Sequence, residues 1–158
     1  MKTSGALLSA DRMYRYSLWR IWDESLPVVM FVGLNPSTAD ESKDDNTIRR
    51  CIGFAKDWGY GGLYMANLFA YRATKPKDMK ATPEPVGNDN NSILVELYNK
   101  ADITIAAWSA DGNFKNRDKE VQLLLPKLHV LKINKDGSPG HPLYLKKSLT
   151  PMPWNFDA

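Results

Sequence analysis

The chain has 158 residues, of which 43% are hydrophobic and 25% are charged, and these proportions are ordinary for one soluble globular domain. No apolar run approaches the roughly 20 residues that span a bilayer, and residues 1–16 lack the apolar core of a signal peptide, so we expect no membrane partner. Cys51 is the only cysteine, which excludes an internal disulfide and favours the cytoplasm. The net charge of +3 allows a local basic patch but indicates no partner by itself.

The first half of the chain alternates strand and helix signals. Residues 13–22 roughly alternate apolar and polar side chains, which predicts an edge strand that pairs with the next one. That next strand covers 28–32, VVMFV, an unbroken apolar run typical of a strand buried on both faces of a parallel sheet. A helix capped by Asp45 or Asn46 follows and ends at a group of glycines, and residues 62–70 form another mostly apolar strand.

The second half continues this alternation after a long proline-interrupted loop at 71–88. Four further elements are expected: a helix over 88–100, a buried strand over 103–108, a helix over 116–128 and a last central strand over 129–133. This order predicts an α/β fold, a three-layer α/β/α sandwich with a central, mostly parallel sheet. We expect a single domain over 1–158, with a tail at 150–158 that is extended or disordered.

Polar and aromatic side chains gather where the apolar runs end. Four such positions occur in order: GLNPS at 33–37, Asn67, Trp108 and His141. Ligands bind at the carboxyl ends of the strands in an open parallel sheet, so the sequence predicts that these positions share a site. Each also has a plainer interpretation: Asn35 as a turn residue, Asn67 as a satisfied buried amide, Trp108 as core and His141 as a surface histidine.

These four signals, in this order, resemble the uracil-DNA glycosylase superfamily. That superfamily has a first motif Gly-x-(Asp/Asn)-Pro after its first core strand, an asparagine on a middle strand that reads the base, and a late motif that begins His-Pro. Here GLNP at 33–36 looks like the asparagine-bearing version of the mismatch-specific and single-strand-selective branches. NLFAYR at 67–72 is similar to the stretch around the base-reading asparagine, and HPLYL at 141–145 to the final loop.

The pattern over most of the chain also resembles a second family. DDNTIRRC at 44–51, GFAKDWGY at 53–60 and HPLYL at 141–145 look like the DUF1643 proteins, an uncharacterised family of bacteria and phages. This second resemblance is the closer one, but it implies little biochemistry. The chemical expectations therefore come from the glycosylase motifs.

The glycosylase resemblance implies a catalytic set. His141 would donate a hydrogen bond to the carbonyl oxygen of the departing pyrimidine, and Asn35 would position the attacking water. Asp40 would add a carboxylate, unless it is simply a solvated loop acid. The remaining pocket residues are implied to hold the flipped base, with Asn67 reading its edge and Phe69 or Tyr71 stacking beneath it. They are Gly33, Leu34, Pro36, Ser37, Asn67, Phe69 and Trp108.

Basic and hydroxyl side chains beside these loops are candidates for holding a DNA backbone. They are Thr38, Arg49, Arg50, Arg72, Lys146 and Lys147. DNA, duplex or single-stranded, is the expected partner, and we expect a monomer. No metal is expected, because His129 and His141 are the only histidines and lack a metal-ligand spacing. The glycosylase resemblance also implies no organic cofactor.

The sequence departs from the uracil enzymes in its late loop, which lacks their Ser-Pro-Leu wedge, although Leu143 or Tyr144 could serve instead. The long loop at 71–88 has no counterpart there. These departures favour a bulky modified pyrimidine over plain uracil, and a role in defence against phages with hypermodified bases is one hypothesis. Two other functions stay open: a non-catalytic module that recognises modified DNA or a nucleobase, and a hydrolase of free nucleosides or nucleotides.

Overall fold

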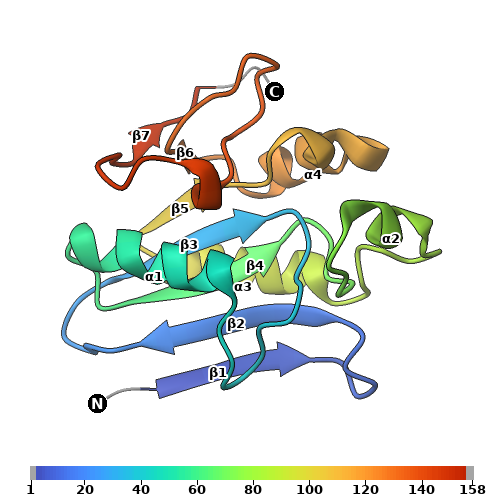
Figure 1. Cartoon of the computed structure of the whole chain (residues 1–158), viewed down its shortest axis with the longest axis horizontal. Helices are drawn as coiled ribbons and strands as arrows, with labels where there is room; N and C mark the ends of the chain where they lie inside the picture. Colours follow the sequence, from blue (N-terminus) through green and yellow to red (C-terminus); the bar gives the residue numbers. More distant parts are fainter. Residues whose placement is uncertain (1–2, 156–158) are drawn as a thin grey trace.

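The computed structural model describes residues 3–155, which form an α/β fold around one seven-stranded sheet with the strand order β1-β2-β4-β3-β5-β6-β7 (Figure 1). The strands are β1 (Thr3–Leu8), β2 (Arg15–Ile21), β3 (Val28–Gly33), β4 (Gly62–Asn67), β5 (Ile103–Ala106), β6 (His129–Val130) and β7 (Met152–Pro153). The helices are α1 (Asn46–Asp57), α2 (Pro76–Ala81), α3 (Asn90–Lys100) and α4 (Arg117–Leu124), with 3-10 segments η1 (Ala110–Asn116) and η2 (Pro142–Tyr144).

The sheet is mixed, with a parallel centre. Strands β4, β3, β5 and β6 run parallel, and Phe31 of β3 lies opposite Met65 on one side and Ile105 on the other. Strands β1, β2 and β7 join antiparallel at the two edges. The mostly parallel sheet expected from the sequence is therefore limited to the four central strands.

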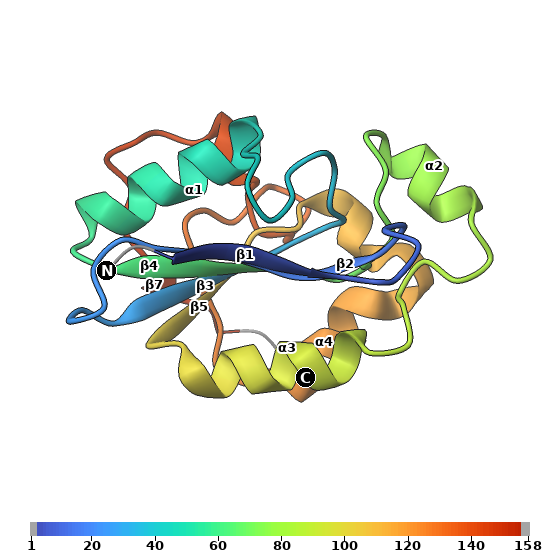
Figure 2. The ribbon, with the colours of Figure 1, turned by 90° about the horizontal axis from the view of Figure 1, so that it is seen from below.

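Apolar side chains cover both faces of the sheet. Successive residues of β3 alternate between the two faces, so Phe31 joins Ile48 of α1 in one core cluster and Met30 joins Leu94 and Val121 of α3 and α4 in the other. Figure 2 shows α1 on one side of the sheet and α3 and α4 on the opposite side. The sheet is thus buried on both faces at its centre.

The expected pairing of the strand at 13–22 with the strand at 28–32 is wrong, because β2 pairs with β1 and β4 instead. The crossover through α1 returns the chain as β4 between β2 and β3. Gly62 permits this close approach, since a Cβ at that position would lie 2.6 Å from the Cδ1 atom of Ile21. The consequence is that β2 borders the strand that carries Asn67.

The sequence did not predict β1 at the sheet edge, α2 inside the predicted loop at 71–88, or the 3-10 segments η1 and η2. Helix α2 begins at Pro76, whose fixed φ suits a first helical turn. Of the expected tail at 150–158, Met152–Pro153 forms β7, while 156–158 lie outside the described residues, as do 1–2 of the expected domain. No helix within 3–155 is long and apolar enough to cross a membrane.

Candidate active site

A cavity of about 530 Å³ lies at the carboxyl ends of the central strands. Its lining comes from the loop after β3, the end of β4, the segment after β5 and the loop that carries His141. The lining residues that the sequence had predicted are Gly33, Leu34, Asn35, Pro36, Ser37, Asn67, Trp108 and His141. The topology therefore gathers four segments that are far apart in the chain.

The strand directions explain this gathering. Strands β3, β4 and β5 are parallel, so their carboxyl ends reach one edge of the sheet. Strand β2 runs the other way, so its first residue, Arg15, arrives at the same edge, where the Arg15 amide donates to the Ala70 carbonyl at 2.9 Å. Helix α1 also begins at this edge. Asp45 caps it by accepting a hydrogen bond from the Ile48 amide at 2.9 Å.

The Asn35 side chain is held by its own amide nitrogen. Nδ2 donates to the Ala73 carbonyl at 2.8 Å and to the Pro36 carbonyl at 3.3 Å. Both partners can only accept, so the amide nitrogen must face them. The Oδ1 atom takes no hydrogen bond within residues 3–155, so it remains an acceptor for a water or a ligand donor.

The hydrogen bond at His141 fixes its tautomer. Nδ1 accepts from the Leu143 amide at 3.2 Å, so a neutral ring carries its proton on Nε2. Burial lowers the pKa of His141, and the nearby Asp45 carboxylate opposes that shift only in part. At neutral pH the ring is therefore uncharged, and its Nε2–H can donate a hydrogen bond to a ligand oxygen.

Asn67 is 2% exposed, and its orientation is also fixed. Its Oδ1 accepts from Nη2 of Arg15 at 3.3 Å, and because a guanidinium only donates, the amide oxygen must face Arg15. Nδ2 then lies beside Gly33, where a Cβ would be 2.9 Å from it. The absence of a side chain at Gly33 therefore leaves room for this amide nitrogen.

Sequence reasoning missed three charged residues that line the cavity: Arg15, Asp45 and Asp111. Asp111 forms an ion pair with Lys80 at 2.8 Å. Asp45 was expected only as a helix cap, and its second oxygen, Oδ2, takes no hydrogen bond within the described chain. A signal for Arg15 was present, since it is a charged residue between large apolar ones in a predicted strand.

Two predicted site residues do not line the cavity. Oδ1 of Asp40 accepts from the amides of Ser42 at 3.0 Å and Lys43 at 2.8 Å, and these hydrogen bonds lower the pKa of Asp40. The Asp40 carboxylate therefore stabilises the turn at residues 40–43 and does not reach the cavity. Phe69 is fully buried because residues after β4 continue into the core, where its ring packs on Phe114 with centroids 5.7 Å apart.

Thr38 and Arg72, two of the predicted backbone contacts, lie in a neighbouring hollow together with Tyr71. The Arg72 guanidinium donates to the carbonyl oxygens of Ser37 at 3.2 Å, Thr38 at 3.3 Å and Arg12 at 3.1 Å. Arg72 thus holds the loop that follows the GLNPS motif. Tyr71, the alternative stacking residue, does not line the cavity.

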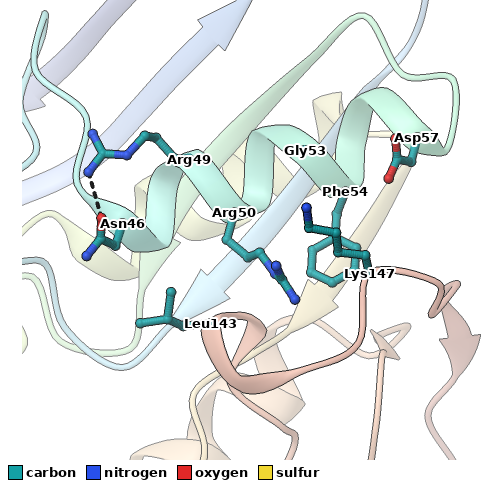
Figure 3. A pocket seen from close by; sticks show the side chains of 8 residues that line it. All are labelled: Asn46, Arg49, Arg50, Gly53, Phe54, Asp57, Leu143 and Lys147. Carbon is teal, nitrogen blue, oxygen red and sulfur yellow. Dashed lines mark hydrogen bonds between the residues drawn. The ribbon is translucent and has the colours of Figure 1, made fainter.

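A separate groove of about 460 Å³ runs along α1, and Figure 3 shows the side chains that line it. We call it the α1 groove; its lining residues are Asn46, Arg49, Arg50, Gly53, Phe54, Asp57, Leu143 and Lys147. Lys146 is exposed but does not line the groove. Asn46 and Leu143 line both hollows, so the groove leads to the cavity.

The α1 groove is cationic, and its arginines are anchored. Arg50 donates to the Leu145 carbonyl and lies over the Phe54 ring, 5.4 Å from its centroid. Arg49 donates to Oδ1 of Asn46 at 2.7 Å. With Lys147 these side chains place three positive charges along one groove that holds a single carboxylate, Asp57.

Within residues 3–155, no group of three or more histidine, cysteine, aspartate or glutamate side chains is placed to hold a metal ion. Searches among curated proteins and among solved structures find no match to the chain. Residues 15–143 match a family model described as "Protein of unknown function (DUF1643)". Because this match covers most of the chain, the protein belongs to the DUF1643 family.

Proposed function

We propose that this protein is a DNA glycosylase that hydrolyses the N-glycosidic bond of a flipped pyrimidine and leaves an abasic site. One observation carries the proposal: Asn35, Asn67, Trp108 and His141, which the glycosylase resemblance singled out, line a single cavity. Helices on both faces of a sheet with a parallel centre also fit the three-layer α/β/α sandwich of that superfamily.

The neutral His141 suits the departure of the base. Breaking the glycosidic bond moves an electron pair onto the base, and a donor aimed at its carbonyl oxygen stabilises the charge that develops. The Nε2–H of His141 is such a donor, because Nδ1 is occupied by the Leu143 amide. This hydrogen bond does not require a charged imidazolium, and burial disfavours the charged form of His141.

Asn35 and Asp45 suit the attacking water. Oδ1 of Asn35 can accept one hydrogen bond from the water, while the Asp45 carboxylate is the cavity acid that has no cationic partner within 4.0 Å in the described chain. An amide orients water but does not take its proton, whereas a carboxylate does. Asp45 therefore takes the catalytic role that the sequence had offered to Asp40.

The cavity volume and Asn67 suit a base. A space of about 530 Å³ is within the range of small-molecule sites and leaves room for a substituted ring. Asn67 would donate from Nδ2 to an acceptor on the base edge. Tyr144, which is 82% exposed at the cavity with its ring 5.5 Å from that of His141, can fill the space that a flipped nucleotide leaves in the duplex.

The α1 groove suits the phosphate backbone. The groove carries a positive strip, formed by Arg49, Arg50 and Lys147, that reaches the cavity at Leu143. A DNA strand lying in the groove would therefore present a nucleotide to the cavity. The room in the cavity favours a modified pyrimidine as substrate. Excision of hypermodified phage bases in antiviral defence is the corresponding biological role.

The test is incubation of the purified protein with duplex and single-stranded DNAs that carry uracil, hydroxymethylcytosine or glucosylated cytosine, together with phage genomic DNA, followed by alkali cleavage. We expect abasic sites on at least one substrate and none with the Asn35→Ala and His141→Ala variants. Binding without abasic sites would indicate a recognition module. Hydrolysis of free nucleosides alone would indicate the small-molecule hydrolase.

A further inference from the structure

Three arginines of the described chain are buried, and one of them has no carboxylate partner. Arg20 is 7% exposed and forms an ion pair with Asp44 at 2.9 Å, and Arg117, 2% exposed, pairs with Glu120. Arg15 is also 2% exposed, yet it forms no ion pair with any described residue. Of the three, only Arg15 lines the cavity.

The contacts of Arg15 leave its charge uncompensated. Nη1 donates to the Ala39 carbonyl at 3.1 Å and Nη2 to Oδ1 of Asn67 at 3.3 Å, while Nε is buried without a partner. Burial lowers the pKa of Arg15 to about 10, so the side chain stays protonated at neutral pH. A buried charge without a counter-charge is costly, so its presence in a binding cavity calls for an explanation by function.

Within the described residues, no carboxylate in the wider surroundings lies close enough to Arg15 to form an ion pair, although Asp45 has the largest effect among its charged neighbours. Asp45 and Asp40 act on Arg15 from outside ion-pair distance, and Arg72 and Arg20 oppose them. The remaining cavity carboxylate, Asp111, is paired with Lys80. The amino end of the twelve-residue helix α1 also lines the cavity and adds positive potential of its own.

We propose that the cavity binds an anion, that Arg15 supplies the positive charge for it, and that the counter-charge of Arg15 arrives with the ligand. The identity of the anion rests on the proposed function: it is the base as it leaves. The C1′–N bond breaks with its electron pair going to the base, a water oxygen bonds to C1′, and the water proton goes to Asp45. The other source of the same charge is a nucleotide phosphate.

Asn67 connects Arg15 to the base. Its amide oxygen accepts from the guanidinium, which polarises the amide and makes its N–H groups stronger donors. Asn67 then donates to the base edge while Arg15 balances the charge behind it. This makes Arg15 a positioning residue that acts through Asn67, as well as the source of positive charge.

The first experiment uses the unaltered protein and needs no catalysis. Binding of free uracil is followed by tryptophan fluorescence from pH 7 upward, with uridine and uridine 5′-monophosphate at each pH. If the base anion is the ligand, the affinity for uracil rises by up to roughly tenfold per pH unit until uracil or Arg15 titrates. If phosphate is the ligand, only the monophosphate binds more tightly than uridine. Equal affinity for neutral and anionic ligands would overturn the proposal.

The second experiment compares Arg15→Met, Arg15→Lys and Lys127→Met, the last at an exposed position outside both hollows. Arg15→Met should lose the preference for the anion, Arg15→Lys should keep part of it, and Lys127→Met should keep all of it, with near-UV circular dichroism to confirm folding. Abasic sites made at the normal rate by Arg15→Met would refute this role and leave the glycosylase proposal standing. Anion binding that depends on Arg15, without abasic sites on any DNA, would support this role of Arg15 and refute the glycosylase proposal.

Discussion

The cavity and the α1 groove lie side by side but differ in how they hold charge. In the cavity, Arg15, Asn67 and His141 are buried or half-buried, and each is fixed by a hydrogen bond to a neighbour. In the groove, Arg49 and Lys147 are exposed. Fixed, dehydrated groups discriminate between ligands and stabilise a particular charge, whereas exposed cations attract any phosphate backbone. We therefore propose that the cavity carries the chemistry and that the groove provides the affinity for DNA.

The largest expected effect separates catalysis from affinity. In the proposed mechanism, replacing Asn35 or His141 with alanine removes the acceptor that positions water or the donor to the base, and we expect single-turnover cleavage to fall by roughly 100-fold or more. Affinity for DNA, measured by gel shift, should change little because the groove is intact. Asn99→Ala, at an exposed position of α3, is the matched control. Equal loss of binding and cleavage would contradict the division between the two regions.

The next effect concerns salt. The double variant Arg49→Ala/Lys147→Ala should weaken binding to all DNA sequences and reduce the slope of log affinity against log salt by about 2. Lys127→Ala/Lys135→Ala, which alters two exposed lysines outside both hollows, should leave the slope unchanged. A slope that stays the same in the groove variant would show that the backbone lies elsewhere.

The pH dependence sharpens the role of His141. Burial lowers the pKa of His141 from its ordinary value of 6.5, so in the proposed mechanism the rate should fall in acidic solution, at a lower pH than for an exposed histidine. The unfolded chain takes up this proton more readily, so the free energy of unfolding also falls as pH drops through about 6.5. A pH–rate profile measures the first effect, and His141→Gln should lack that acid limb. A rate that rises as His141 gains a proton would be incompatible with this mechanism.

Two glycines give the smallest and most local comparison. A methyl group at Gly33 would lie 2.9 Å from Nδ2 of Asn67 and 3.0 Å from Cε of Met65, so Gly33→Ala should weaken base binding. Gly53, in the middle of α1, meets nothing within 4 Å, and Gly53→Ala should raise the free energy of unfolding by about 0.5–1 kcal/mol. Base titration and urea denaturation measure the two effects. Equal behaviour of the two variants in both measurements would remove the argument for a tight cavity wall.

The sequence alone could predict the parts of the site that follow apolar strands. The run at 28–32 ends directly before GLNPS, and the same pattern placed Asn67 and Trp108, so local composition was enough. The convergence of these segments follows from parallel pairing, which strand and helix alternation predicts. Strands β1 and β2 could not be placed this way, because their partners depend on where the chain returns to the sheet after the α1 crossover.

Arg15 and Asp45 show why other cavity residues could not be predicted from the sequence. Arg15 faces the cavity because β2 runs antiparallel beside β4, a pairing between segments that sequence patterns did not connect. Asp40 and Asp45 stand in the same polar loop, and only the start of α1 decides that Asp45 lines the cavity. Arg15 owes its position to a tertiary contact, whereas Asp45 is placed by local capping of α1 and reaches the cavity only because α1 begins at this edge of the sheet.

Mass spectrometry of the free bases released from phage and modified DNA tests the proposal that the cavity breaks a glycosidic bond. We predict that the protein releases one pyrimidine species, that the DNA keeps an abasic site for each base released, and that Asn35→Ala releases none. Release of a nucleoside or nucleotide instead of a base, or no release from any DNA that the protein binds, would contradict the claim.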